Sequence, residues 1–325
     1  MEALGTQGVG SLAPHPEALT LAACVNDYPA LLSPIWLPQR HFLETARGKL
    51  SYLTCGPENG APVLCVHGWL DNAASFIPVF NAAAQANLPI RFIAIDLCGH
   101  GHSYHLPQGM SYGVWEYLPD IKALIDHLSL SQVMMLGHSL GAGLSTVFTA
   151  ALGKQIKSLL LVESIAPLVA SANDFAAELG HSLVQHAKSR RPARTYKSLD
   201  AAVKARASGK YPLSEAHARL LVSQAIQPVE GGVQWRHDSR LVLPSPVRLT
   251  EPQVISCIQS IHQPVRLVRG DQGVEINNLA QQLKTFKQVT TYTLQGNHHL
   301  HMQSGPAEQL ANMLGQWLDP VAKLS

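Results

Sequence analysis

The fold of this 325-residue chain is decided by one stretch, Met134-Met135-Leu136-Gly137-His138-Ser139-Leu140-Gly141-Ala142-Gly143. The apolar run at 133–136 predicts a buried strand, and the small residues after Leu140 predict a helix that ends near Leu152. The Gly-x-Ser-x-Gly pattern between them is typical of a strained turn that lifts a serine hydroxyl above a sheet. Glycine is expected at 137 and 141 because a side chain there would collide with the neighbouring strand and helix. The stretch therefore predicts Ser139 as a nucleophile.

Working outward, short apolar runs typical of buried strands alternate with segments of helical periodicity. Strands are expected at 41–44, 49–55, 62–66, 91–96, 133–136, 156–163, 264–268 and 289–294. Helices are expected at 114–128, 140–152, 277–287 and 306–317. This alternation predicts an α/β fold with a mostly parallel, doubly wound sheet.

The alternation is interrupted between Glu163 and the strand at 264–268, which divides the chain into three parts. Residues 1–38 form a leader that we expect to be poorly ordered, and 39–163 with 263–325 form the core. Residues 164–262 show helical periodicity at 176–188, 198–207 and 214–224 without a strand series, so they predict a helical cap inserted after the strand ending at Glu163. The cap has twelve Lys/Arg and seven Asp/Glu, a difference of +5, which leaves −3 for the rest of a chain whose net charge is +2. This charge is typical of a solvated helical face, and it would also attract anionic substrates.

Composition excludes several classes of protein. A hydrophobic fraction of 46% with 14% charged residues indicates a globular chain, and a net charge of +2 argues against nucleic-acid binding. No apolar run reaches the roughly 20 residues of a membrane span. Leu21-Ala22-Ala23-Cys24 is similar to a lipoprotein cleavage box, but residues 1–23 contain no Lys or Arg. Five cysteines without a Cys-x-x-Cys spacing predict reduced thiols and a cytoplasmic protein, which we expect to be a monomer or homodimer.

The base that would activate Ser139 is expected near the C-terminus, because the chain order in this kind of site is nucleophile, acid, histidine. The strand at 289–294 is followed by Gln295-Gly296-Asn297-His298-His299-Leu300-His301-Met302. His298 is the favoured base, since Gly-x-His places it at the mouth of the loop, and His299 is the alternative. No carboxylate or cysteine lies beside them at metal-ligand spacing, so no metal is expected.

Two carboxylates compete to be the third member of the site. Glu163 ends an apolar buried strand, where a charge is costly without a partner and where a doubly wound sheet builds its site. Asp271 lies in Gly270-Asp271-Gln272-Gly273, a turn in which aspartate often binds only the backbone. We favour Glu163 and keep Asp271 as the alternative acid.

Two backbone N–H groups are candidates for an oxyanion hole. Leu140 directly follows the nucleophile at the start of a helix, and Trp69 follows the strand at 62–66 in His67-Gly68-Trp69. His67 is interpreted as a structural histidine bonded to the backbone. The Trp69 ring either lines a pocket or packs.

These motifs resemble the α/β-hydrolase superfamily over about 40–163 and 264–320. Within it, the chain is similar to the serine hydrolase-like protein family, on the basis of these segments: His67-Gly68-Trp69-Leu70-Asp71-Asn72, Gly99-His100-Gly101-His102-Ser103, Gly137-His138-Ser139, Gly296-Asn297-His298 with His301-Met302, and Trp235-Arg236-His237-Asp238-Ser239-Arg240-Leu241. The resemblance implies a Ser–His–acid enzyme with a helical lid that uses Ser139 and His298. It also implies a carboxylate at Glu163, because Gly273 stands where the common Gly-x-x-Asp pattern has its aspartate.

Together these features predict a serine hydrolase, similar to carboxylesterases, that cleaves an ester or related acyl bond of a small molecule. It would form an acyl-enzyme and need no cofactor. Alternative functions with the same site are acyl transfer and cleavage of a carbon–carbon bond. A third possibility is a binding protein that keeps the fold without turnover.

Overall fold

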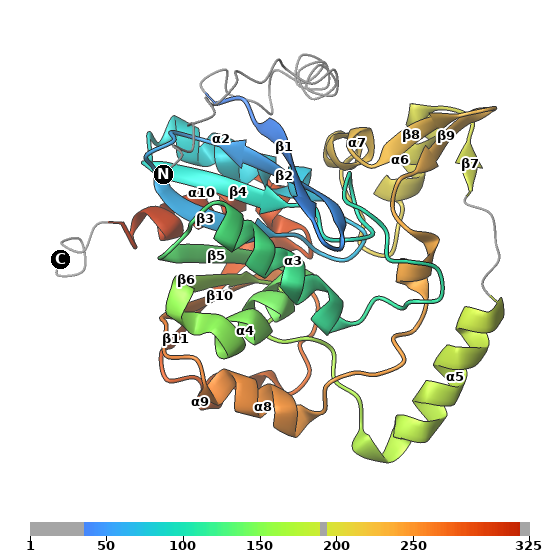
Figure 1. The fold of residues 1–325 in the computed structure, drawn as a ribbon. Helices are drawn as coiled ribbons and strands as arrows, with labels where there is room; N and C mark the ends of the chain where they lie inside the picture. The colour runs from blue at the N-terminus through green and yellow to red at the C-terminus, as the bar shows by residue number, and fades with distance from the viewer. Residues whose placement is uncertain (1–35, 189–193, 319–325) are drawn as a thin grey trace, which may run out of the picture.

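The computed structural model describes residues 36–188 and 194–318. The predicted leader and its Leu21–Cys24 box fall almost entirely outside these residues. An eight-stranded sheet has the order β1-β2-β4-β3-β5-β6-β10-β11 (Figure 1). Its strands are β1 Gln39–Thr45, β2 Gly48–Cys55, β3 Ala61–Val66, β4 Ile90–Ile95, β5 Val133–His138, β6 Ile156–Val162, β10 Val265–Gln272 and β11 Val289–Asn297. Only β1–β2 and β2–β4 pair antiparallel; the other pairs are parallel, as predicted.

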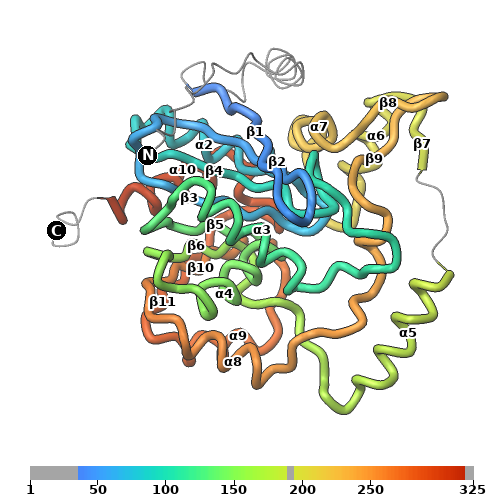
Figure 2. The backbone as a smooth tube through the Cα atoms, in the orientation of Figure 1, coloured from blue at the N-terminus to red at the C-terminus, as the bar shows by residue number. Residues whose placement is uncertain are grey.

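The central strands are apolar throughout because helices cover both faces of the sheet. Along β3, Val63 and Cys65 point into one buried cluster, whereas Leu64 and Val66 point into the other. The first cluster lies under α2 Ile77–Gln85 and α10 Ser304–Gly315, and the second under α3 Val114–His127 and α4 Leu140–Leu152. The tube in Figure 2 shows α3 and α4 in front of the sheet. Sequence reasoning did not predict α2.

The inserted segment contains more than the predicted helices. It holds α5 Phe175–Lys188, α6 Leu199–Ala207 and α7 Glu215–Ser223, close to the expected ranges. It also holds a three-stranded antiparallel sheet of β7 Thr195–Tyr196, β9 Gly232–Trp235 and β8 Ile226–Val229, in the order β7-β9-β8. The expectation of no strands here was wrong, because strands of two to four residues are too short to show a periodicity.

The helix α8 Glu251–Gln259 was predicted as part of the cap, yet it packs against α4 and against α9 Leu279–Thr285, which are core helices. Its buried Val254 and Ile258 belong to the same apolar cluster as Phe148 of α4. The chain therefore returns to the core layer before β10, some residues earlier than the predicted boundary at 263.

One arginine links the inserted segment to the core. The Arg240 guanidinium forms an ion pair with Asp238 and donates hydrogen bonds to the backbone oxygens of Leu106, Pro107 and Met110. Because both side chains are largely buried, the pair fixes the segment 238–242 against the loop that precedes α3.

Two further expectations concern cysteines and membrane spans. Among the described residues, Cys55, Cys65, Cys98 and Cys257 are free thiols, and the first three are buried. No helix within 36–188 and 194–318 is both long enough and apolar enough to cross a membrane.

Candidate active site

The turn between β5 and α4 holds Ser139 in a strained conformation. Its φ of 51° and ψ of −113° lie in a region that residues other than glycine rarely adopt. Glycine at 141 makes this turn possible. The start of the helix lies so close to β3 that a Cβ added to Gly141 would be 1.9 Å from the Val66 backbone oxygen. The glycine requirement predicted at 141 is thus confirmed, and the serine side chain is left partly exposed.

Three side chains from distant parts of the chain meet at the carboxyl ends of the parallel strands. His298, just beyond β11, lies with its Nε2 atom 3.1 Å from the Ser139 hydroxyl oxygen. Its Nδ1 atom lies 3.1 Å from the Glu163 carboxylate, which follows β6. The histidine is 6% exposed and the glutamate 1%. With Nδ1 donating to the carboxylate, Nε2 of a neutral His298 is free to accept the serine proton.

The buried Glu163 carboxylate is fully engaged by donors. Beside His298, it accepts hydrogen bonds from the N–H groups of Gly270 at 2.6 Å and Val274 at 2.8 Å. A Cβ on Gly273 would lie 2.2 Å from a Glu163 oxygen, so this glycine makes the space that the carboxylate occupies. Glu163 has a φ of 62°, a strained backbone angle for a residue other than glycine.

Asp271, the alternative acid, lies elsewhere. It is exposed, and its carboxylate accepts a hydrogen bond from the Gly296 N–H at 2.8 Å. It lies within β10, not in the turn that the sequence predicted, and it binds the backbone of the paired strand β11 two residues before His298.

His299, the alternative base, belongs to a second polar group beneath the loop. Its Nε2 atom lies 3.2 Å from the Asp71 carboxylate, which also binds Arg206 of α6 at 2.7 Å. Burial alone would raise the pKa of Asp71, but His299 and Arg206 hold it well below its ordinary value. Sequence reasoning gave no role to Asp71 or Arg206. Asp71 lies in the loop after β3, five residues beyond the end of that strand, and Arg206 lies in a helix of the inserted segment, so neither position has a local signal.

Two more rings surround His298 and were not predicted. Tyr211, in the loop between α6 and α7, has its ring centroid 4.2 Å from that of His298. On the other side His138 donates from Nε2 to the His298 backbone oxygen at 2.8 Å. His138 is the variable residue of the Gly-x-Ser-x-Gly turn, so the turn holds both the serine and the backbone of the histidine.

The loop after β3 lies against the start of α4. His67 accepts a hydrogen bond from the Leu97 N–H at Nε2 and donates from Nδ1 to the Gly68 oxygen, so it is the structural histidine that was predicted. The Trp69 ring is 41% exposed, and its N–H donates to the Leu241 backbone oxygen in the inserted segment at 2.9 Å. Trp69 thus connects the core to the segment above it.

Four histidines near this site are fully buried, and burial lowers the pKa of each: His67, His100, His138 and His301. They stay neutral in the folded chain but gain a proton on unfolding below pH of about 6.5. The stability from keeping them neutral is complete above that pH and is lost as the pH falls towards their folded pKa values. We expect the melting temperature to fall between pH 6.5 and 5, with up to about 1.4 kcal/mol of unfolding free energy lost per pH unit for each histidine.

The matched variant for this measurement is His301→Leu. Among the described residues neither ring nitrogen of His301 has a hydrogen-bond partner, and the ring packs on Phe76. We expect the variant to fold and to lose one histidine's share of the pH dependence. A melting temperature that stays constant from pH 7 to 5, or an unchanged slope in the variant, would contradict this account.

The fold and the grouping of Ser139, His298 and Glu163 define a class of protein. The family model of the alpha/beta hydrolase fold matches residues 61–227. The chain therefore belongs to the α/β-hydrolase family and is a hydrolase of that class.

Within the family, the chain resembles the serine hydrolase-like proteins. It is 24% identical to the "Serine hydrolase-like protein" of Danio rerio over 321 residues, covering 88% of this chain and 94% of the relative. A crystal structure of a hypothetical protein from Pseudomonas aeruginosa PAO1 is 34% identical, covers 86% of this chain and 99% of that one, and superposes with a TM-score of 0.80. The thioesterase domain from the curacin biosynthetic pathway is 29% identical, with coverage of 85% and 98% and a TM-score of 0.75.

Proposed function

We propose that this protein hydrolyses a carboxylic ester or related acyl bond, with Ser139 as nucleophile, His298 as base and Glu163 as acid. The observation that carries the proposal is the chain of two 3.1 Å contacts, from the serine hydroxyl to Nε2 and from Nδ1 to the carboxylate. This order of groups is what a serine needs to lose its proton at neutral pH.

The reaction begins when His298 Nε2 takes the Ser139 proton and the serine oxygen attacks the acyl carbon. The carbonyl oxygen becomes an oxyanion, which the backbone N–H groups of Leu140 and Trp69 would bind. Losing one such donor costs about 10² to 10³ in turnover in related chemistry. The imidazolium then returns its proton to the leaving group, which departs and leaves an acyl-enzyme.

Deacylation repeats these steps with water in place of the serine. His298 removes a proton from the water, the hydroxide attacks the acyl carbon, and Ser139 leaves with the proton from Nε2. Glu163 acts through His298, because its carboxylate fixes the Nδ1–H tautomer and stabilises the imidazolium in both halves. Tyr211 and Trp69 would border the acyl group, consistent with an inserted segment that acts as a cap over residues at the strand ends.

Thioesters belong to the same acyl class and are included in the proposal. Support comes from the 29% identity to a thioesterase domain, which extends over 85% of this chain. The same Ser139 chemistry serves both leaving groups, since a thiolate needs less help from the His298 proton than an alkoxide.

The proposal is tested by labelling folded protein with a fluorophosphonate probe and by assaying chromogenic esters and acyl thioesters of graded chain length. We expect probe labelling that Ser139→Ala abolishes and hydrolysis of at least one substrate series. Assays with and without an alcohol acceptor distinguish hydrolysis from acyl transfer. Folded wild-type protein that takes up no probe would overturn the proposal and favour the non-catalytic alternative.

A further inference from the structure

Helix α5 has its polar side turned towards the protein and its apolar side turned outward. The residues on its inner side are Glu178, Leu179, Ser182, Gln185 and His186, four of them polar. Ser182 is fully buried, and it and His186 both donate hydrogen bonds to the Pro244 backbone oxygen, at 2.8 and 3.2 Å. The helix is thus anchored through polar groups, the reverse of an ordinary surface helix.

The outward side, which we call the α5 face, consists of Ala176, Ala177, Gly180, Leu183, Val184 and Ala187. Leu183 is 60% exposed and Val184 is 47% exposed, and Phe175 at the start of the helix is 49% exposed. Figure 1 shows α5 at the edge of the molecule, away from the eight-stranded sheet and from helices α6 and α7. A contiguous apolar surface of this kind marks a site of association.

A glycine in the middle of this face has no explanation within one copy of the chain. A Cβ added to Gly180 would meet nothing within 4 Å, and its φ is that of an ordinary helix. Glycine at such a position costs the helix about 1 kcal/mol relative to alanine. It is useful when another backbone must approach closely at that point.

The charges at the two ends of α5 indicate what that other backbone is. The exposed Asp174 lies at the start of the helix and the exposed Lys188 at its end, with Gly180 and His181 midway between them. The α5 face itself carries no charge. An antiparallel second copy would set each Asp174 near the Lys188 of its partner and would also oppose the two helix dipoles favourably.

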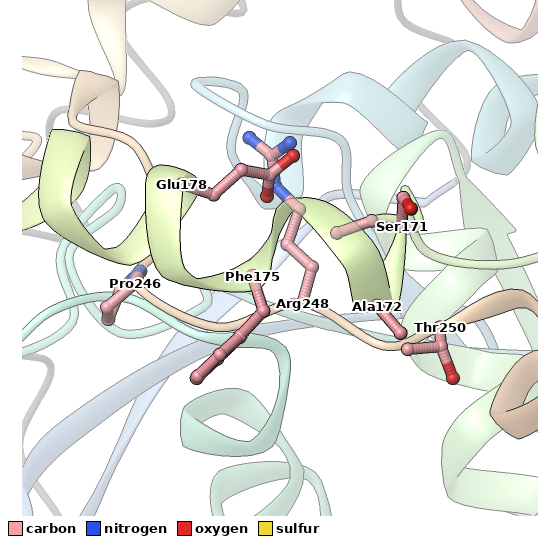
Figure 3. A pocket seen from close by; sticks show the side chains of 8 residues that line it. Ser171, Ala172, Phe175, Glu178, Pro246, Arg248 and Thr250 are labelled. Atoms are coloured by element: carbon pink, nitrogen blue, oxygen red, sulfur yellow. The ribbon is translucent and has the colours of Figure 1, made fainter.

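We propose that the α5 face binds the α5 face of a second copy of this chain in an antiparallel, two-fold dimer that crosses at Gly180. The base of the helix is accessible to a neighbour as well. A cavity of about 200 Å³ lies beside Phe175, and Figure 3 shows Glu178 of α5 and Arg248 extending side by side at its rim. In the dimer, the α5 face of each chain would lie next to the inserted segment of its partner.

The first test measures the mass of the protein in solution by sedimentation and light scattering. Protein concentrations of about 1 to 100 µM cover the dissociation constants expected of a small dimer interface. We expect wild-type protein to reach twice the 35.1 kDa of one chain. The double variant Leu183→Asp/Val184→Asp should weaken the dimer at least about 100-fold, because it would bury four carboxylates in the interface. Leu152→Asp is the matched control, because Leu152 is 40% exposed at the far end of α4.

The second test uses Gly180, where the proposal and a purely structural role predict opposite results. Gly180→Leu should leave the melting temperature of a single chain unchanged or raise it, since leucine favours a helix, yet it should weaken the dimer. Gly180→Cys should form a disulfide between copies under mild oxidation, whereas wild type and Leu152→Cys should not.

Several measured outcomes would overturn the proposal of an antiparallel dimer. A wild-type mass of one chain at every concentration, or a dimer that survives Leu183→Asp/Val184→Asp, would refute it. So would a monomer that binds phosphatidylglycerol vesicles through the α5 face, because the occupant would then be a membrane. A dimer that does not cross-link at Gly180→Cys would refute the antiparallel crossing.

Discussion

Removing the Ser139 hydroxyl or the His298 imidazole is expected to lower kcat by about 10⁴ to 10⁶, and removing both is expected to cost no more than removing one. The reason lies in the 3.1 Å contact between the hydroxyl oxygen and Nε2. Each group acts only through the other, since serine cannot attack with its proton in place and the base has nothing else to activate. The measurement is single-turnover and steady-state hydrolysis of the best ester by Ser139→Ala, His298→Ala and the double variant.

Two matched variants separate this effect from general damage. Ser158→Ala removes a buried serine at the opposite end of β6 whose hydroxyl has no hydrogen-bond partner in the described residues, so activity should change little. His299→Gln replaces the alternative base and can still donate to Asp71, so turnover should stay within about tenfold of wild type. Additive losses for Ser139→Ala and His298→Ala, or a larger loss in His299→Gln, would show that the roles are assigned wrongly.

The second large effect is expected for Glu163→Gln, which should lower kcat by about 10⁴. In either orientation, a glutamine amide puts an N–H group against a donor: Gly270 N–H on one side, or Val274 N–H and His298 Nδ1 on the other. With the amide nitrogen beside His298, the imidazole is driven to the tautomer whose Nε2 carries the proton and cannot accept one from Ser139. Kinetics should be read together with melting temperature, because a buried mismatch also destabilises the fold.

Asp271→Asn is the counterpart of this experiment. Asparagine keeps the oxygen that accepts from the Gly296 N–H, and the side chain is exposed, so kcat should stay within a few-fold of wild type. If Asp271→Asn abolishes turnover while Glu163→Gln preserves it, the acid has been assigned to the wrong carboxylate.

Much of the core was predictable because its signals are local. The strand–turn–helix around Ser139 combines an apolar run, two glycines and small helix residues, and the structure has β5 and α4 there. The elements that were missed lack such a signal. In helix α2, eight of the nine residues are buried, so its sequence has few of the polar residues that mark the exposed side of a surface helix. The strands β7, β8 and β9 are too short to show alternation.

In the candidate site too, some residues have a local sequence signal and others do not. Ser139 and His298 each stand in a recognisable turn at a strand end. Arg206 and Tyr211 lie in the inserted segment, in sequence that is typical of any exposed helix and loop. Their place beside His299 and His298 depends on how that segment folds back over the sheet. No local pattern carries that information.

By itself, the sequence determined the elbow at Ser139 and the alternating order of the sheet, because steric and hydrophobic rules act between residues close in the chain. Only the tertiary structure decided which carboxylate reaches His298. Glu163 directly follows β6 and Asp271 lies near the end of the neighbouring strand β10, and the sequence favoured the first only modestly. The difference between them lies in side-chain direction and space: Gly273 leaves room for the Glu163 carboxylate, while Asp271 turns to the backbone of Gly296.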